Sequence, residues 1–179
     1  MRKRVVLCMF LFACGKQSEP GADWSAKPLD ATIESKVKGV PFKLSVPKGW
    51  KFDGVGSAKE DDADAITKEW RPDVKDYFSE PSVSVSYAAI PAKDLDGFVS
   101  DAMLDKDKDE IAKKEQTADG FVMLSYKKKD KGIVRVHVLK RKGDVHLNCR
   151  ASQAKTGGVP SPDATMAWLE KMCGSLTPL

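Results

Sequence analysis

The sequence predicts an α+β domain in which an antiparallel β-sheet is flanked by a mid-chain helix and a C-terminal helix. Three observations support this fold class. From residue 31 onward, apolar and polar residues mostly alternate, which is the period-two pattern of strands with one buried face. The alternation is interrupted near residues 93–105, where apolar residues fall at helical spacing. The chain then ends in a second helical segment that carries its own start and stop signals.

The strands of the first half are predicted from alternation and from one glycine turn. Gly39 separates two strands in the segment TIESKVKGVPFKLSV, and further strands follow in AITKEWR and SVSVSY. The alternation predicts three sets of residues that each share one strand face: Phe42, Leu44 and Val46; Ile66, Lys68 and Trp70; and Val83, Val85 and Tyr87.

The second half is predicted to be a helix followed by a meander of four strands. Leu95, Phe98, Val99 and Leu104 lie at helical spacings, which predicts a helix near 93–105 despite one internal glycine. The strands that follow are expected at 110–117, 121–128, 133–141 and 144–153.

The register of the last two hairpins is predicted from the lengths of their turns. A two-residue turn at Lys142–Gly143 would set Val138 opposite Leu147. A three-residue loop at Asp130–Gly132 would set Leu124 opposite Val138. Both registers place the valines of the central strand on the core face.

The C-terminal helix has recognisable ends and an apolar stripe. Ser161 is a good N-cap residue, Pro162 suits the first helical position, and Gly174 is expected to end the helix. Four residues of the segment are expected to face the sheet: Met166, Leu169, Cys173 and Leu176.

The first 13 residues have the pattern of an export signal, with three basic residues before an apolar run of eight. A helix that crosses a bilayer needs about 20 apolar residues, so this run is not expected to span a membrane. Removing residues 1–13 leaves 27 Lys and Arg (30 less 3) against 26 Asp and Glu, so the net charge falls from +4 to +1. A nearly neutral domain is not expected to bind nucleic acid.

The residues LFACGK at 11–16 resemble the lipobox of bacterial lipoproteins, with Ala13 directly before Cys14 and Leu11 three positions before it. By this resemblance, Cys14 receives a diacylglyceryl group and the chain is cut after Ala13. The alternative is a plain secretory signal with a chance cysteine. Residues 14–30 are rich in small, polar and proline residues, and are expected to be a flexible tether to a single globular domain at 31–179.

The lipobox resemblance implies a cell-envelope protein held to a membrane by its lipid. The position after Cys14 is Gly15 rather than the aspartate that retains lipoproteins in the inner membrane of enteric bacteria. This favours the outer membrane, facing the periplasm, if the cell has one.

Cys149 and Cys173 are the two cysteines of the predicted domain. An isolated pair in an oxidising, exported setting most often forms a disulfide. The bond would close a loop of about 24 residues and stabilise the domain by roughly 3 kcal/mol. The alternative is a pair of free buried thiols.

The order of these elements, and the strand FKLSV that leads into the turn Pro47-Lys48-Gly49-Trp50, resemble the PsbP/Mog-like α/β/α sandwich over residues 40–177. Members of this fold mostly act as binding or assembly proteins without catalysis, so the resemblance implies a non-enzymatic module. It carries no functional residues with it. A sheet covered on one face only, or a cystatin-like sheet, is the alternative architecture.

One polar face of the predicted sheet is a candidate binding site. The predicted register places five residues on the face turned away from the valines: Arg135, His137, His146, Asn148 and Arg150. The two histidines are expected as diagonal neighbours, with Asn148 opposite His137. No carboxylate or cysteine on this face completes a metal site. The patch is therefore interpreted as an ordinary polar surface or as a binding patch for a small anion or a partner.

The sequence contains no catalytic motif such as G-x-S-x-G, a P-loop or H-E-x-x-H. No catalytic residue, metal or cofactor is predicted. The expected function is that of a membrane-anchored binding or assembly module with a protein partner in the envelope. The alternative is an envelope hydrolase, or a protein that binds a small ligand or anion, using the face of His137 and His146.

Overall fold

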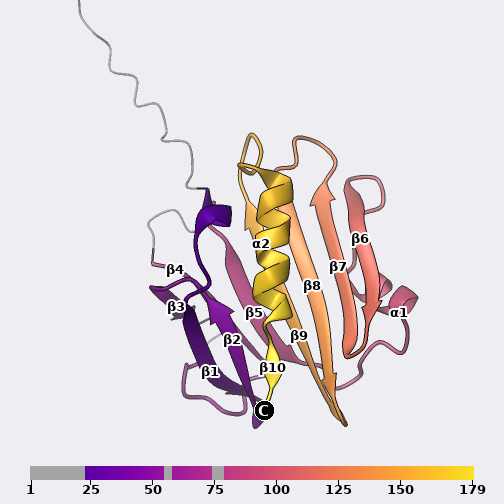
Figure 1. The fold of residues 1–179 in the computed structure, drawn as a ribbon. Coiled ribbons are helices and arrows are strands. Elements are labelled where there is room, and N and C mark those ends of the chain that lie inside the picture. Colours follow the sequence, from indigo (N-terminus) through magenta and orange to yellow (C-terminus); the bar gives the residue numbers. More distant parts are fainter. Residues whose placement is uncertain (1–22, 55–57, 74–78) are drawn as a thin grey trace, which may run out of the picture.

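The computed structural model describes residues 23–54, 58–73 and 79–179, which contain two antiparallel sheets and two α-helices (Figure 1). The large sheet has the strand order β3-β4-β5-β9-β8-β7-β6, and the small sheet has the order β1-β2-β10. The elements are η1 (Trp24–Ala26), β1 (Ala31–Val37), β2 (Val40–Val46), β3 (Trp50–Asp53), β4 (Thr67–Pro72), β5 (Ser82–Tyr87), α1 (Leu95–Asp101), β6 (Asp109–Thr117), β7 (Gly120–Lys127), β8 (Ile133–Lys142), β9 (Val145–Ala154), α2 (Pro162–Gly174) and β10 (Thr177–Pro178).

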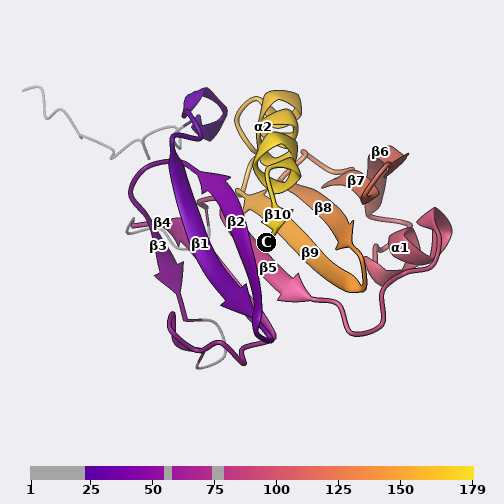
Figure 2. The same cartoon turned by 60° about the horizontal axis from the view of Figure 1, so that its bottom comes forward.

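The large sheet is covered on both faces. Helix α2 and the small sheet pack on one face, and α1 covers part of the other face near β6 and β7 (Figures 1 and 2). Each cover has its own apolar cluster, so the molecule is a sheet between two unequal layers. This arrangement confirms the predicted α+β fold class with two flanking helices. The separation of β1 and β2 into a second sheet was not predicted.

The main core lies between the large sheet, the small sheet and α2. The predicted strand faces are mostly confirmed, since Phe42, Leu44, Val83 and Val85 are fully buried there. Ile66 is an exception because it precedes β4 and is 58% exposed.

Lys68 is buried in the main core and keeps its ammonium group hydrogen-bonded. Its Nζ donates to the Glu60 carbonyl over 2.6 Å and to the Ser35 hydroxyl over 3.3 Å. A buried charged residue is tolerated only with partners of this kind.

The second cluster explains why α1 is present on the opposite face. Phe98 of α1 packs against Phe121, Met123 and Leu139, which point away from the main core. The helix is shorter than the predicted 93–105. It starts where the Asp94 carboxylate accepts a hydrogen bond from the Gly97 amide over 2.8 Å, and it ends at Asp101.

The register of the β8–β9 hairpin differs from the prediction. Val138 pairs with Cys149 rather than Leu147, because the turn consists of Gly143 and Asp144. Gly143 has φ +58° at the first turn position, as a type II′ turn requires. The partner moves by two residues, so the predicted strand faces are retained.

The β7–β8 hairpin is displaced in the same way. Leu124 pairs with Val136 rather than Val138, because the loop has five residues, 128–132, instead of three. Asp130 and Lys131 both adopt left-handed backbone conformations, with φ 60° and 48°. Such conformations are uncommon outside glycine, so the sequence pointed to the shorter loop.

Helix α2 has the predicted limits and buries the predicted stripe. Trp168 and Met172 are buried with it. Ser161 occupies the N-cap position, but its left-handed backbone, φ 45°, prevents the expected side-chain cap. Its hydroxyl donates to the Asp23 carboxylate over 3.2 Å instead.

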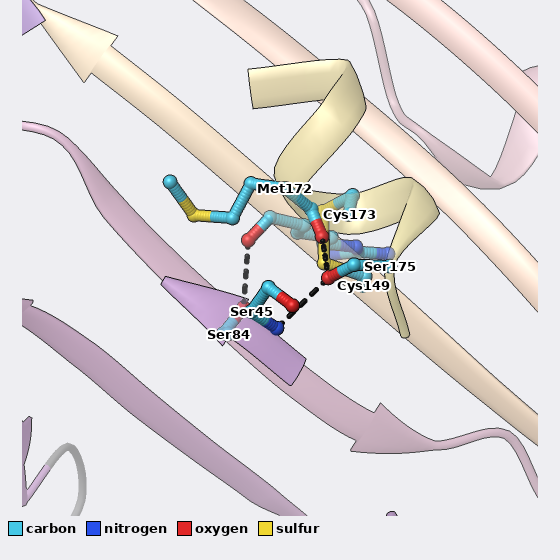
Figure 3. Close-up of a disulfide and its surroundings, with 7 residues drawn as sticks. Ser45, Ser84, Cys149, Met172, Cys173 and Ser175 are labelled. Atoms are coloured by element: carbon cyan, nitrogen blue, oxygen red, sulfur yellow. Dashed lines mark hydrogen bonds between the residues drawn. A yellow bond between two sulfur atoms is a disulfide. The ribbon is translucent and has the colours of Figure 1, made fainter. Parts of the chain in front are cut away.

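A disulfide joins α2 to β9, as the sequence predicts. Cys149 and Cys173 are both fully buried and their Cα atoms lie 5.4 Å apart (Figure 3). Beside the bond, the Ser175 hydroxyl donates to the Met172 carbonyl over 2.6 Å and accepts from the Ser45 amide over 2.8 Å. The end of α2 is therefore fixed to both sheets.

Residues 23–30 lie against the domain, although they belong to the range 14–30 that is expected to be a tether. Trp24 contacts Trp50 edge to face, with ring centroids 6.4 Å apart, and its indole donates to Glu80. Trp50 in turn contacts Trp168 edge to face, with ring centroids 6.2 Å apart. The Trp168 indole donates to the Lys27 carbonyl over 2.8 Å. These contacts form a tryptophan latch, which we define as Trp24, Trp50 and Trp168.

The predicted signal and the predicted lipidation site at Cys14 lie outside the described residues. Among the residues that are described, neither helix combines the length and the hydropathy needed to cross a bilayer.

Candidate functional site

The outer face of the large sheet, opposite α2, carries two rows of polar side chains that cross β5, β9 and β8. Directly paired residues form each row, so their side chains point to the same side. We call these six residues the outer-face patch: Ser84, Arg150 and His137 in one row, and Ser82, Ser152 and Arg135 in the other.

The outer-face patch lines an open depression of about 310 Å³. Glu69 of β4 lies at one side of it, and Ala102, which follows α1, lies at the other. The small second cluster holds α1 against the sheet, so this helix forms a wall instead of covering the patch. The depression is therefore polar and open to solvent, with hydroxyl, guanidinium and imidazole groups as its donors.

Arg135 is fixed by a buried carboxylate. Asp109 is 4% exposed and accepts from Arg135 over 3.0 Å and from Lys127 over 2.9 Å. Burial raises the pKa of Asp109, but hydrogen bonds from Lys127, the Asp105 amide and Arg135 outweigh it and hold the pKa below the usual carboxyl value. Asp109 therefore stays ionised and positions the Arg135 guanidinium.

Arg150 is exposed and has no acidic partner within residues 23–54, 58–73 and 79–179. The nearby acid, Glu69, is already paired with Arg71 of its own strand. Arg150 is therefore the cation of the patch that is available to an external anion.

His137 lies between the two arginines and is half-buried. Burial lowers the pKa of its ring to about 4, and the charges of Arg150 and Arg135 add to that effect. The ring is therefore neutral at physiological pH, with one nitrogen as donor and the other as acceptor. A general acid or base works best with a pKa near the working pH, so this environment does not favour acid–base catalysis.

The two other predicted residues of the patch lie outside it. Asn148 pairs with Leu139, and Arg150 takes the predicted place of Asn148 opposite His137. Asn148 lines a smaller depression of about 30 Å³ under α1, together with His137 and Arg150.

His146 lies farther along the same hairpin, opposite Arg141, and its Nδ1 is 3.1 Å from the Asp144 carbonyl oxygen. It is four residues from the partner of His137, which is about 13 Å along a strand. The predicted diagonal contact between the histidines is therefore wrong, because the hairpin register differs by two residues. The described part of the chain also holds no group of three or more His, Cys, Asp or Glu residues placed to bind a metal.

The sequence analysis missed the three serines of the patch. The alternation in SVSVSY places Ser82 and Ser84 on one strand face, but nothing local indicated that β5 pairs with β9, which carries Ser152. It also missed Ile90 and Met103, which are 92% and 90% exposed. Ile90 lines the smaller depression, and Met103 follows Ala102 at the wall of the patch.

The architecture matches a known structure over nearly the whole chain. The solution structure of cyanobacterial PsbP (CyanoP) from Synechocystis sp. PCC 6803 superposes with a TM-score of 0.51, covering 94% of this chain and 99% of that one. The chain has a PsbP-like fold. The two sequences are 12% identical, so the PsbP-like fold is the whole of what this match shows.

A crystal structure from Bacteroides thetaiotaomicron VPI-5482 is also similar, with a TM-score of 0.39 and 12% identity over 77% of this chain and 45% of that one. This similarity is too weak to add information about the fold. No protein-family model and no curated protein matches the sequence. The PsbP-like fold confirms the architecture expected from the element order, and the site must be interpreted from its own residues.

Proposed function

We propose that this protein is a lipid-anchored, non-catalytic binding module of the cell envelope, whose outer-face patch binds an acidic segment of a protein partner. One observation carries the proposal. Arg150 is an exposed cation without an acidic partner in the described residues, and it lies beside Arg135 and three serine hydroxyls in an open depression.

The chemistry of the patch suits a carboxylate. Arg150 offers a planar fork of N–H groups, and hydrogen bonds between charged groups are about twice as strong as neutral ones. Ser82, Ser84 and Ser152 add hydroxyl donors within the same depression. Neutral His137 contributes a hydrogen bond without a third positive charge.

Exposed apolar side chains beside the patch favour a protein over a free anion. Ile90 and Met103 stand almost fully in solvent next to the depressions that Arg150 lines. Methionine and arginine are both enriched in protein interfaces. A partner that places a carboxylate on Arg150 would also cover these two side chains.

The PsbP-like fold supports a non-catalytic role, since proteins that resemble it mostly act as accessory binding or assembly proteins. The alternative of an envelope hydrolase would need His137 and His146 to act together, and the register separates them. His137 would also be a weak base, because its pKa is lowered to about 4.

The proposed anchor is lipid on Cys14, with cleavage after Ala13 and location in the outer membrane facing the periplasm. The sequence LFACGK and the basic, short apolar segment before it support this. The substitution Cys14→Ser should move the protein from the membrane fraction to the soluble fraction of the envelope. Unchanged membrane retention of this variant after a high-salt wash, which screens surface charge attraction, would contradict the anchor.

The binding patch is tested by photocrosslinking in the native envelope. A photoreactive residue in place of Ser84 should capture a protein partner, and Arg150→Glu should reduce the adduct by about tenfold or more. Lys36→Glu is the matched control, because Lys36 is exposed near the β1–β2 turn and far from the patch.

Equal adduct yield in the Arg150 and Lys36 variants would refute the partner site. Specific retention of phosphate by the purified protein, without any protein adduct, would assign the patch to a free anion instead.

A further inference from the structure

A second, larger depression of about 780 Å³ lies at one end of the large sheet, where β7, β8 and β9 meet their loops. Ile133 and Ala154 form part of its lining, and the aliphatic stems of lysines surround them. We call it the lysine depression. Its charged lining consists of five lysines and two aspartates: Lys108, Lys127, Lys128, Lys129, Lys155, Asp107 and Asp130.

Three of these lysines form no ion pair among the described residues, and because Asp107 and Asp130 of the same lining are fewer, the depression keeps a net positive charge. Lys108 pairs with Asp105, and Lys127 pairs with Asp109. Lys128 donates to a backbone carbonyl, and neither it nor Lys129 nor Lys155 has a carboxylate partner within the described ranges.

The lysine depression lies at the end of the domain from which the N-terminal segment leaves. The Ser161 hydroxyl joins the start of α2 to Asp23, the first described residue, over 3.2 Å. The Val159 amide donates to the Lys131 carbonyl over 3.2 Å, which places the β7–β8 loop beside the β9–α2 loop. Figure 1 shows both loops at the same end of the molecule as η1.

The length of chain before Asp23 limits how far this end can stand from a membrane. Nine residue steps separate Cys14 from Asp23 in the sequence. A chain spans at most about 3.3–3.6 Å per residue, so these steps reach no more than about 32 Å. The tryptophan latch keeps residues 23–30 on the domain and adds no length to this reach.

We propose that the lysine depression docks on the anionic headgroups of the membrane to which the chain is anchored. Lysines near an anionic bilayer each contribute roughly a fivefold gain in binding (about 1 kcal/mol). The attraction acts within a Debye length of about 8–10 Å, which the short connection makes accessible. The inference rests on the proposed lipid anchor, which supplies the high local concentration of membrane at this end.

The docking fixes the orientation of the domain. Ile133 and Ala154 continue the outer face of β8 and β9 from the patch toward this end, since they lie two positions beyond Arg135 and Ser152. The outer-face patch then stands beside the membrane surface and faces along it. A partner that reaches the patch would itself be at or near the membrane.

The test uses the chain from residue 14 with Cys14→Ser, which has no lipid, and vesicles with and without phosphatidylglycerol. We expect binding to the anionic vesicles only, and weaker binding as salt is added. The triple variant Lys128→Gln, Lys129→Gln, Lys155→Gln should bind about a hundredfold more weakly. Its thermal unfolding midpoint should match that of the parent, because its substitutions leave the core intact.

The matched control is Lys36→Gln, Lys38→Gln, Lys59→Gln, which removes the same charge at the other end of the molecule. Equal loss of binding in both triple variants, or equal binding to neutral and anionic vesicles, would overturn the proposal. Vesicle binding that depends on the three lysines of the depression supports the docking surface, even if the cellular test shows that Cys14 is not lipidated. Movement of the Cys14→Ser variant to the soluble fraction of the envelope, together with no vesicle binding, would contradict the docking surface and leave the anchor in place.

Discussion

At the scale of single residues, His137 shows how the outer-face patch controls charge. Its ring lies between two arginines on a face where α1 restricts access to water. Burial disfavours the charged ring, and a proton there would also place three positive charges together, so the pKa of His137 is lowered to about 4. Above about pH 4 the ring of His137 is neutral, so the positive charge of the patch lies on its two arginines.

The lowered pKa of His137 predicts a specific loss of stability in mild acid. The unfolded ring binds a proton near pH 6.5, while the folded ring binds one only near pH 4. The unfolded state therefore takes up more protons in this window, and the free energy of unfolding falls as pH decreases from about 6.5 to 4, by up to about 3 kcal/mol. Denaturant unfolding at a series of pH values measures this slope.

His137→Asn should remove most of the slope, whereas His146→Asn should retain it, since His146 is outside the patch. A parent protein whose stability is flat over this window, or an NMR titration of His137 near 6.5, would contradict the assignment.

Gly120 is a second residue at which local geometry leads to a prediction. Its φ is +159°, and a Cβ at this position would lie 1.7 Å from the Leu139 carbonyl oxygen. Gly120→Ala must therefore separate the backbones of β7 and β8, and we expect a loss of more than 2 kcal/mol in the free energy of unfolding. Gly143→Ala is the comparison, since no atom lies within 4 Å of its Cβ position and only the backbone strain at φ +58° remains. That strain costs about 1 kcal/mol. Equal losses in the free energy of unfolding for Gly120→Ala and Gly143→Ala would contradict the predicted backbone clash at Gly120.

At the scale of elements, strand faces and the hairpin neighbours β7, β8 and β9 could be predicted from the sequence, but the register within the hairpins could not. The valines of β8 lie on the predicted face because alternation depends only on each strand. The partner of Val138 was wrong by two residues, since it depends on which residues adopt left-handed conformations in the turn. The five-residue β7–β8 loop is the clearest case, because Asp130 and Lys131 give no local signal for positive φ.

The disulfide is an element-level feature with a measurable contribution. It fixes α2 to β9 across 24 residues of chain, and loss of such a link costs roughly 3 kcal/mol in the loop-entropy model. We expect Cys149→Ala with Cys173→Ala, or reduction, to lower the free energy of unfolding by about that amount. Denaturant curves with and without reductant measure it. An unchanged midpoint in the reduced parent would contradict a structural role.

At the scale of the whole molecule, the candidate site combines residues that the sequence places far apart. Arg135, His137 and Arg150 were predicted to share a face, and they do line one depression. Their neighbours on β5 could not be predicted, because β5 and β9 are separated by α1 and three strands of chain. Nonlocal pairing of this kind depends on the packed fold and not on any turn between the two strands.

The tryptophan latch holds residues 23–30 against the rest of the domain, and this role can be tested at Trp24. Trp24→Ala removes a half-buried ring and a hydrogen bond to Glu80, so we expect a loss of about 2 kcal/mol and faster proteolysis within residues 23–30. Trp24→Phe should keep most of the ring contact with Trp50 and lose less stability. Limited proteolysis with mass analysis measures the cleavage. Identical cleavage rates in the parent and Trp24→Ala would show that the latch does not hold this segment.

Asp109 links the two surfaces through one carboxylate. It is shared by Lys127, which lines the lysine depression, and Arg135, which belongs to the outer-face patch. If an anion at one surface attracts Lys127 or Arg135 away from Asp109, the carboxylate neutralises the remaining cation more completely. The positive potential of the other surface then becomes weaker. The two surfaces are therefore electrically coupled, and occupancy of one is expected to lower the affinity of the other. By linkage this effect is reciprocal, so a partner on the outer-face patch is expected to loosen the membrane contact as much as the membrane loosens the partner.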